Sequence, residues 1–146
     1  MSATRHLRRR APFALLACIW LVATTAFAQD PRASIVQSVA REWLLLADKL
    51  DAAATWKAAG PRFQQSLTQA RWAVGLARER EPRGAIVRRT LRATSFGTTF
   101  AGLPESGNYA LVTFRSSFAQ QSNSEEHLTL ELGADETWRV IGYVIL

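Results

Sequence analysis

His127 is the side chain best suited to acid–base chemistry in this chain, and it is the only histidine after His6. It lies directly beside Glu125 and Glu126, and a carboxylate can orient an imidazole and stabilise its charged form. The alternation of His127 with Leu128 places it on the solvent side of a predicted strand. Catalysis by Asp or Glu with His127 is therefore only an alternative interpretation.

Arg89 and Glu126 form a second candidate site, whose chemistry would be the recognition of an anion. The planar fork of arginine donates two parallel hydrogen bonds to a carboxylate or phosphate group. We hypothesise that the two side chains meet across a sheet, as a structural ion pair or as an arginine that Glu126 holds for a ligand. Two separate surface charges are the remaining possibility. Tyr109 and Trp138 complete the predicted ligand-binding set, although large rings in small domains mostly form the core.

Other classes of site lack the residues that they need. The only cysteine, Cys18, lies in the N-terminal leader, so the remaining chain has no thiol for a disulfide, a nucleophile or a zinc site. Ser116 and Ser117 have no partner base placed by spacing, which leaves a hydrolase triad unsupported. No glycine-rich phosphate loop is present. We predict no metal and no cofactor.

The first 28 residues predict a secretory signal peptide. Four arginines precede an apolar run over residues 11 to 22, and Ala26-Phe27-Ala28 has the pattern of a cleavage site. Cleavage after Ala28 leaves residues 29 to 146 as a single domain without a stable membrane span, in the periplasm or outside the cell. A minor alternative keeps the segment as a membrane anchor, either uncleaved or lipidated at Cys18.

Export also changes the charge of the working protein. Four of the 18 basic residues and none of the 12 acidic ones lie in the leader, so the formal net charge falls from +6 to +2. The densest remaining basic run, over residues 78 to 89, is interleaved with Glu79 and Glu81. Because a nucleic-acid-binding domain needs a clustered basic face, we predict no nucleic-acid partner.

A period of 3.6 residues predicts helices in the first half of the domain. The expected ranges are 31 to 49, 52 to 59, a short turn at 62 to 67, and 69 to 80. Asp51 and Thr68 are expected to cap two of these helices by accepting hydrogen bonds from free backbone N–H groups. The apolar stripe expected on the first helix comprises Ile35, Val36, Val39, Ala40, Trp43, Leu46, Ala47 and Leu50.

From residue 86 the period changes to two, which predicts strands over residues 86 to 98, 108 to 119, 125 to 132 and 138 to 145. This order indicates an α+β fold, with N-terminal helices packed on one face of a four-stranded antiparallel meander, NTF2-like or cystatin-like in shape. The last strand is apolar on both faces. We therefore expect it to be central, or covered on its second side by the curl of the sheet or by a second copy in a homodimer.

Many spaced residues follow one ordered pattern: Trp43, Asp48, Asp51, Trp56, Trp72, Arg80-x-Pro82-x-Gly84, Arg89, Gly107-x-Tyr109, Phe114-x-x-Ser117-Phe118, Glu126 and Trp138-Arg139-Val140-x-Gly142-Tyr143. In this order they resemble the bacterial domain-of-unknown-function family number four thousand and nineteen. Its members are small exported proteins without an assigned reaction, so the resemblance implies a fold and a compartment only. Leu50 and Ala52 depart from the family pattern, in which a small turn residue and often a tyrosine stand there.

These patterns favour an exported binding or interaction domain over an enzyme. Its partner would be a small ligand or an unidentified protein, bound through the sheet face or a cleft between helices and sheet. The alternative is a small NTF2-like hydrolase or isomerase that uses Asp or Glu with His127. An enclosed pocket that contains both a carboxylate and His127 would favour the enzyme.

Overall fold

The computed structural model describes residues 30–104 and 106–146. The predicted signal peptide and its cleavage site at Ala28 lie outside these residues. Within them, no helix is long and apolar enough to cross a bilayer. The elements, in chain order, are α1 (Arg32–Asp48), α2 (Ala52–Ala58), α3 (Pro61–Ser66), α4 (Gln69–Arg80), the 3-10 turn η1 (Glu81–Arg83), β1 (Ile86–Gly97), β2 (Tyr109–Phe118), β3 (Ser124–Leu132) and β4 (Trp138–Ile145).

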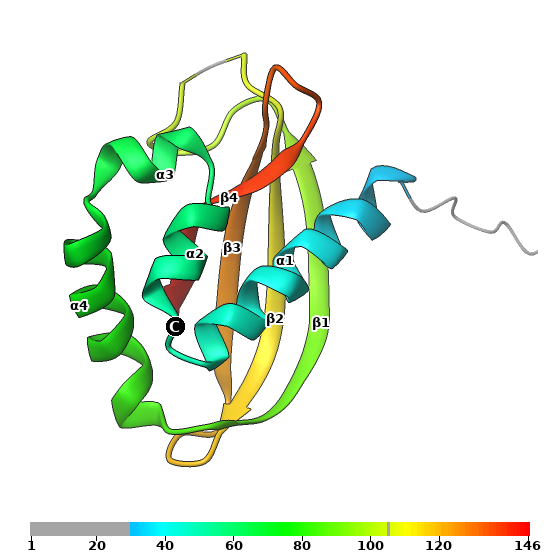
Figure 1. Ribbon diagram of the computed structural model, residues 1–146. Coiled ribbons are helices and arrows are strands. Elements are labelled where there is room, and N and C mark those ends of the chain that lie inside the picture. The colour runs from blue at the N-terminus through cyan, green and yellow to red at the C-terminus, as the bar shows by residue number, and fades with distance from the viewer. Residues whose placement is uncertain (1–29, 105) are drawn as a thin grey trace, which may run out of the picture.

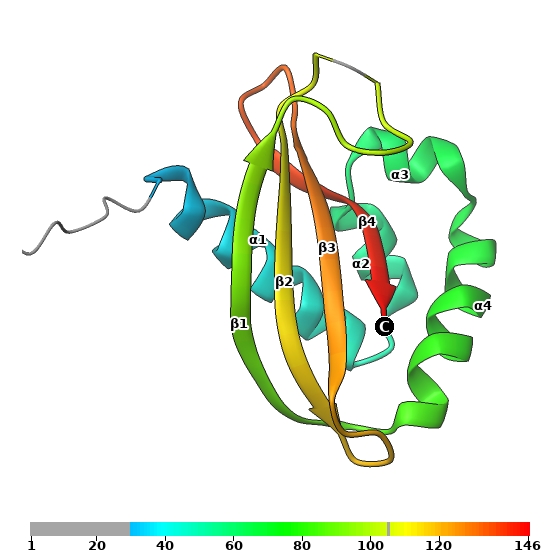
Figure 2. The same cartoon turned by 180° about the vertical axis from the view of Figure 1, so that it is seen from behind.

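The strands form one antiparallel sheet in the order β1-β2-β3-β4. The described helices lie on one face of this sheet or, in the case of α4, beyond its β4 edge (Figures 1 and 2). The predicted α+β meander with helices on one face is thus confirmed. We call the face against the helices the covered face. The opposite face, which includes Thr90, Arg115, His127 and Thr129, is called the open face.

The covered face supplies most of the core. Ala110, Val112 and Phe114 of β2 and Leu128 and Leu130 of β3 are all fully buried. They recur at every second position because successive side chains of a strand point to opposite faces. The predicted alternation in these two strands is confirmed.

Aromatic rings fill the space between helices and sheet, as expected for the core of a small domain. The ring centroids of Trp43 and Trp72 are 5.8 Å apart, and those of Phe63 and Trp72 are 5.0 Å apart. Tyr143 of β4 lies 5.1 Å from Trp43. The side-chain oxygen of Thr68 accepts a hydrogen bond at the start of α4, as predicted, and the helix thereby presents Trp72 to the core.

The buried side of α1 differs in part from the predicted stripe. Ala40 and Trp43 are buried, but Ile35 is 54% exposed and Leu50 is 43% exposed. Both were wrong as core predictions, whereas Leu44 is fully buried. The stripe is centred nearer to Leu44, which leaves Ile35 at its margin, and Leu50 lies beyond the end of the helix.

The chain leaves α1 through a left-handed residue, Leu50, with φ of 56°. The backbone N–H groups of Leu50 and Asp51 donate to the carbonyls of Ala47 and Leu46, at 3.0 and 3.1 Å. This is the Schellman arrangement, which satisfies the last carbonyls of a helix. The Asp51 carboxylate then accepts from the N–H of Ala54 at 2.9 Å and starts α2. The predicted break and cap are confirmed.

β4 is an edge strand, so the first alternative expected for it, a central position in the sheet, was wrong. Leu130 pairs with Val140, but Thr129 pairs with Gly142, because a β-bulge adds one residue to β4. An extra residue reverses the alternation of side chains beyond it. Strict alternation predicts Trp138, Val140 and Val144 on one face of this strand and Ile141, Tyr143 and Ile145 on the other. Beyond the bulge this grouping is wrong, because Tyr143 turns to the covered face with Val140, and Val144 turns to the open face.

A second bulge lies at the start of β1. Ile86 pairs with Phe118, whereas Arg88 pairs with Ser117, so β1 contains one residue more than β2 over this stretch. The bulge turns the side chain of Arg89 to the covered face and that of Arg88 to the open face. Strict alternation from Ile86 would have placed Arg88 inside.

Leu50→Gly should raise the free energy of unfolding by roughly 1 kcal/mol, because a residue with a Cβ atom is disfavoured by about that amount in the left-handed region. The half-exposed Leu50 side chain contributes little burial that glycine would lose. Leu50→Ala is the control, since it shortens the side chain and retains Cβ. Urea unfolding of the three proteins measures the difference, and equal effects of glycine and alanine would contradict the backbone explanation.

Candidate functional site

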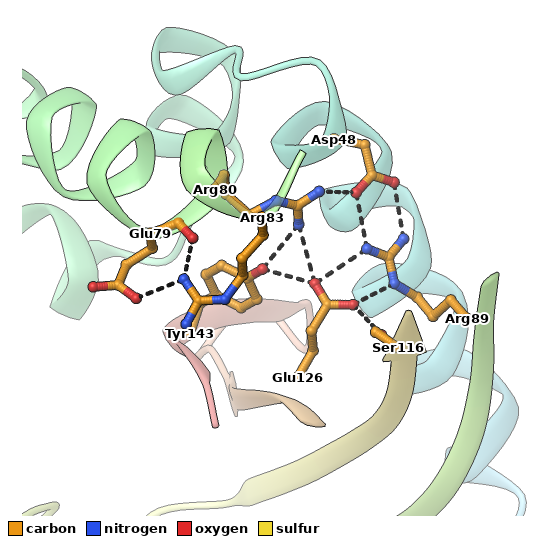
Figure 3. Close-up of polar contacts among 8 residues, drawn as sticks. All are labelled: Asp48, Glu79, Arg80, Arg83, Arg89, Ser116, Glu126 and Tyr143. Carbon is orange, nitrogen blue, oxygen red and sulfur yellow. Dashed lines mark hydrogen bonds and ion pairs between the residues drawn. The ribbon is translucent and has the colours of Figure 1, made fainter. Parts of the chain in front are cut away.

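Four charged side chains meet on the covered face, at one end of the sheet (Figure 3). Asp48 ends α1, Arg80 ends α4, Arg89 belongs to β1 and Glu126 belongs to β3. Each comes from a different element, so the tertiary fold brings them together. We refer to these four residues as the charge cluster.

Glu126 is fully buried at the centre of the charge cluster. It accepts hydrogen bonds from Arg80 Nη1 at 3.1 Å, Arg89 Nε at 2.6 Å and Arg89 Nη2 at 3.1 Å. The hydroxyl of Tyr143 donates at 2.7 Å, and that of Ser116 donates as well. A carboxylate offers about four lone-pair sites. The hydrogen-bonding capacity of Glu126 is therefore fully used within the protein.

Arg89 joins Glu126 to Asp48. Its Nη1 and Nη2 atoms donate to the two Asp48 oxygens, both at 2.8 Å, while its Nε and Nη2 atoms contact Glu126. Arg80 also bridges the two acids, because its Nη2 atom donates to Asp48. Each arginine thus contacts each carboxylate. Two positive and two negative groups make the cluster neutral.

Local structure explains how each helix delivers its charge. Arg80 lies four residues after Leu76 and eight after Trp72, so it continues the buried side of α4. A cation at the end of a helix also interacts favourably with the helix dipole, whereas the Asp48 carboxylate at the end of α1 does not. The two arginines compensate for the unfavourable position of Asp48.

The ion pairs favour the charged forms of Asp48, Arg80 and Arg89. Burial by itself would raise the pKa of the Asp48 carboxyl, but the hydrogen bonds and charges of Arg89 and Arg80 outweigh it and lower this pKa below 3.8. Burial would lower the pKa of Arg89, yet its bonds to Asp48 and Glu126 raise it. Burial and the nearby Glu126 raise the pKa of the Tyr143 hydroxyl, which stays protonated as a donor.

The cluster is closed to solvent. The side chains of Arg80 and Glu126 are 3% and 0% exposed, and those of Arg89 and Asp48 are 12% and 13% exposed. The ring of Phe118 lies 4.8 Å from the Arg80 guanidinium carbon and covers it further. Buried charges are costly unless each is paired and hydrogen-bonded. The arrangement is that of a structural ion-pair network that connects α1 and α4 to the sheet.

The four predicted ligand-binding residues do not gather into one site. Arg89 and Glu126 meet across the sheet, as hypothesised, with Nε and Oε2 2.6 Å apart. Tyr109 begins β2 and pairs with Glu131, and Trp138 begins β4 and pairs with Leu132. Both therefore lie at the opposite end of the sheet from the charge cluster. The binding role of these residues stays a prediction.

Sequence reasoning missed two members of the charge cluster and one neighbour. From the sequence, a position at a helix end explains Asp48, and the interleaved basic run over residues 78 to 89 predicts a solvated position for Arg80. Tyr143 was placed on the wrong face because the β4 bulge has no clear sequence signal. The spacing of Trp72, Leu76 and Arg80 is the signal that could have revealed a buried arginine.

His127 lies on the open face, and its side chain is 25% exposed. Its Nε2 atom is 3.2 Å from a carboxylate oxygen of Glu125, whereas Glu126 faces the other side of the sheet. Among the described residues, no group of three or more potential ligating side chains is placed to hold a metal ion.

Several hollows mark the described surface. One on the open face, which we call the arginine hollow, has a volume of about 430 Å³. A second, at the other end of that face, has about 320 Å³ and lies against Phe100, Leu111 and Ile141. His127 and the charge cluster line neither of them. The arginine hollow is lined by Val87, Arg88, Thr90, Arg115, Ser116, Ser117 and Asn123.

The chain matches a family model described as "Protein of unknown function (DUF4019)" over residues 39–143. The chain belongs to this family. All four cluster residues fall within the matched range, so the cluster is part of the family domain. No curated protein and no solved structure matches significantly, and the NTF2-like or cystatin-like shape stays a prediction.

Arg89→Met should lower the free energy of unfolding by roughly 3–5 kcal/mol, because it leaves the two carboxylates of Glu126 and Asp48 with Arg80 as their only cation, and so one buried negative charge uncompensated. Arg62→Met is the matched control. It breaks an ion pair of 2.7 Å with Glu131, in which the Arg62 side chain is 38% exposed, and should cost less than about 1 kcal/mol. Denaturant unfolding compares the two variants, and similar losses would contradict a structural role for the cluster.

The stability of the protein should decrease in acid because of Asp48. Its pKa is below 3.8 in the folded protein, so the unfolded chain takes up a proton first as the pH falls. The stabilisation from Asp48 is complete above about pH 4 and is lost as the pH falls below that value. Urea unfolding between pH 2 and 7 should show a shallower acid slope for Asp48→Asn than for the unchanged protein. Parallel profiles would contradict this assignment.

Proposed function

We propose that this chain is an exported, non-enzymatic binding domain that uses the open face of its sheet. The observation that carries the proposal is the closure of the charge cluster. The strongest concentration of charged groups in the described fold is buried, neutral and bonded to itself. Recognition is therefore assigned to the surface that the helices leave uncovered (Figure 2).

The state of Glu126 argues against catalysis at the charge cluster. A general base must come within hydrogen-bond reach of a substrate proton, but Glu126 is fully buried and already accepts five hydrogen bonds. Freeing it would leave Arg80 and Arg89 with Asp48 as their only counter-charge in the cluster. His127, on the opposite face, contacts Glu125 and cannot share a site with this carboxylate.

The two ends of the open face differ in chemistry, which suits recognition. At one end, the arginine hollow presents two guanidinium groups with hydroxyl and amide side chains. At the other end, the smaller hollow is lined mainly by apolar groups, including Leu111 and Ile141. Binding sites typically combine apolar surface with a few well-placed polar groups.

Export is proposed from the N-terminal leader. Its basic start, short apolar run and Ala26-Phe27-Ala28 end have the order of a cleaved signal peptide. The domain needs no cysteine for its stability in an oxidising compartment, because the core is built from aromatic and aliphatic side chains. Mass spectrometry of the protein from its native cells should find an N-terminus at Gln29.

A thermal-shift screen tests the use of the open face. Chemically diverse small molecules are added to the protein, and each compound that raises the melting temperature is tested again on variants at the two ends of the face. Thr129→Arg blocks the apolar end and Arg115→Glu alters the arginine hollow. We expect at least one of these variants to abolish the stabilisation, since a ligand raises stability only by binding the folded state.

Two variants outside the open face serve as controls. Val74→Arg and Arg78→Glu change side chains on α4 that are 69% and 77% exposed. Stabilisation should survive both changes. Compounds that remain active on both open-face variants would overturn the proposal. Size-exclusion chromatography at micromolar concentration detects the competing use of this face, which is a homodimer through the sheet.

A further inference from the structure

We propose that the arginine hollow binds a phosphoryl or sulfuryl group, with Arg88 and Arg115 as its anchors. This inference rests on the proposed use of the open face and specifies the chemistry of the ligand. The hollow has a volume of about 430 Å³, which is enough for such a group and part of the molecule that carries it.

Strand register places the donors of this site side by side. Arg88 of β1 pairs with Ser117 of β2, and Thr90 pairs with Arg115. The two arginines therefore occupy diagonal positions on the same face. Diagonal positions are about 7–8 Å apart in such a ladder, a separation that long side chains can close around one anion. The β1 bulge between Ile86 and Arg88 is what turns Arg88 outward.

The two arginines lack the partners that others in this fold have. Within residues 30–104 and 106–146, neither Arg88 nor Arg115 has a carboxylate within 4.0 Å, whereas Arg62, Arg89 and Arg139 each form an ion pair of 2.8 Å or less. Like charges at neighbouring positions of a sheet repel each other. A bound anion would relieve this repulsion.

The acidic side chain paired across the strands with Arg115 does not neutralise the site. Glu125 is the cross-strand neighbour of Arg115 on β3. Its carboxylate oxygens are instead 3.2 Å from Arg92 Nε and 3.2 Å from His127 Nε2. The positive charge of Arg92 thus compensates the negative charge of Glu125. The positive charges of Arg88 and Arg115, which line the hollow, remain uncompensated.

The mixture of donors indicates the shape of the anion. Arg88 and Arg115 come from two strands, and Thr90, Ser117 and Asn123 line the same space. The Thr90 hydroxyl also donates to the Arg115 carbonyl oxygen at 3.4 Å. Arginine forks pair well with phosphate oxygens. Donors from several directions match a tetrahedral oxyanion better than a planar carboxylate. The group can belong to a small ligand or to a phospholipid headgroup.

The test is a titration of the purified protein with inorganic phosphate, followed by backbone amide NMR. We expect saturable shifts confined to residues 87 to 90, 115 to 117 and 123, with similar shifts for sulfate. The Arg88→Gln/Arg115→Gln double variant should weaken binding at least tenfold. Arg78→Gln is the control for the loss of an exposed arginine elsewhere, because Arg78 lies on α4 and is 77% exposed. It should leave the affinity within twofold.

A vesicle experiment then identifies the source of the group. The group is assigned to a lipid headgroup if the protein co-sediments with phosphatidylglycerol vesicles but not with phosphatidylcholine vesicles, and if the double variant loses this co-sedimentation. Phosphate binding without vesicle binding would assign a small ligand. Both results support the site.

Three results would overturn the proposal: shifts that do not saturate, equal binding of acetate, or equal losses in the double variant and Arg78→Gln. After any of these results the phosphoryl site is rejected. The open face nevertheless remains the binding surface if the thermal-shift screen finds ligands whose stabilisation only Thr129→Arg abolishes. If the ligands of that screen are insensitive to both open-face variants, the proposed function is rejected as well.

Discussion

Charge neutrality inside the protein is the constraint on which the rest of the fold depends. Two arginines and two carboxylates lie where helices and sheet meet, and each arginine contacts both acids. Removing any one of them would leave a buried charge without compensation, which costs far more than the pair contributes over an apolar alternative. The need to pair these buried charges therefore fixes the relative positions of four elements, namely the ends of α1 and α4 and the strands β1 and β3. Hydrophobic packing alone does not impose this arrangement.

This constraint separates structure from recognition. Arg88 and Arg89 are adjacent in the chain, but the β1 bulge sends them to opposite faces of the sheet. Arg89 neutralises the interior, whereas Arg88 faces solvent beside Arg115. Bulges often re-aim side chains near functional sites because they shift the alternation without breaking the sheet. One extra residue in β1 thus places Arg89 in the charge cluster and Arg88 in the arginine hollow on the open face.

Much of the fold follows from local patterns. Alternation in β2 and β3 indicated which side chains enter the core, since a half-buried strand repeats every two residues. Asp51 and Thr68 indicated helix starts, because their side chains accept from free backbone donors. The pairing of Arg89 with Glu126 was hypothesised correctly. Asp48, Arg80 and Tyr143 were not foreseen as partners. A central position in the sheet was one of the alternatives expected for β4, which is an edge strand.

Taken alone, the sequence determined the elements, their order, the α+β class and most of the core, because these depend on periodicity and capping between near neighbours in the chain. The tertiary structure decided the faces of β1 and β4 and the membership of the charge cluster. A bulge depends on how two strands register against each other, and neutrality depends on charges from positions as far apart as Asp48 and Glu126. Neither property is encoded within a local stretch of residues.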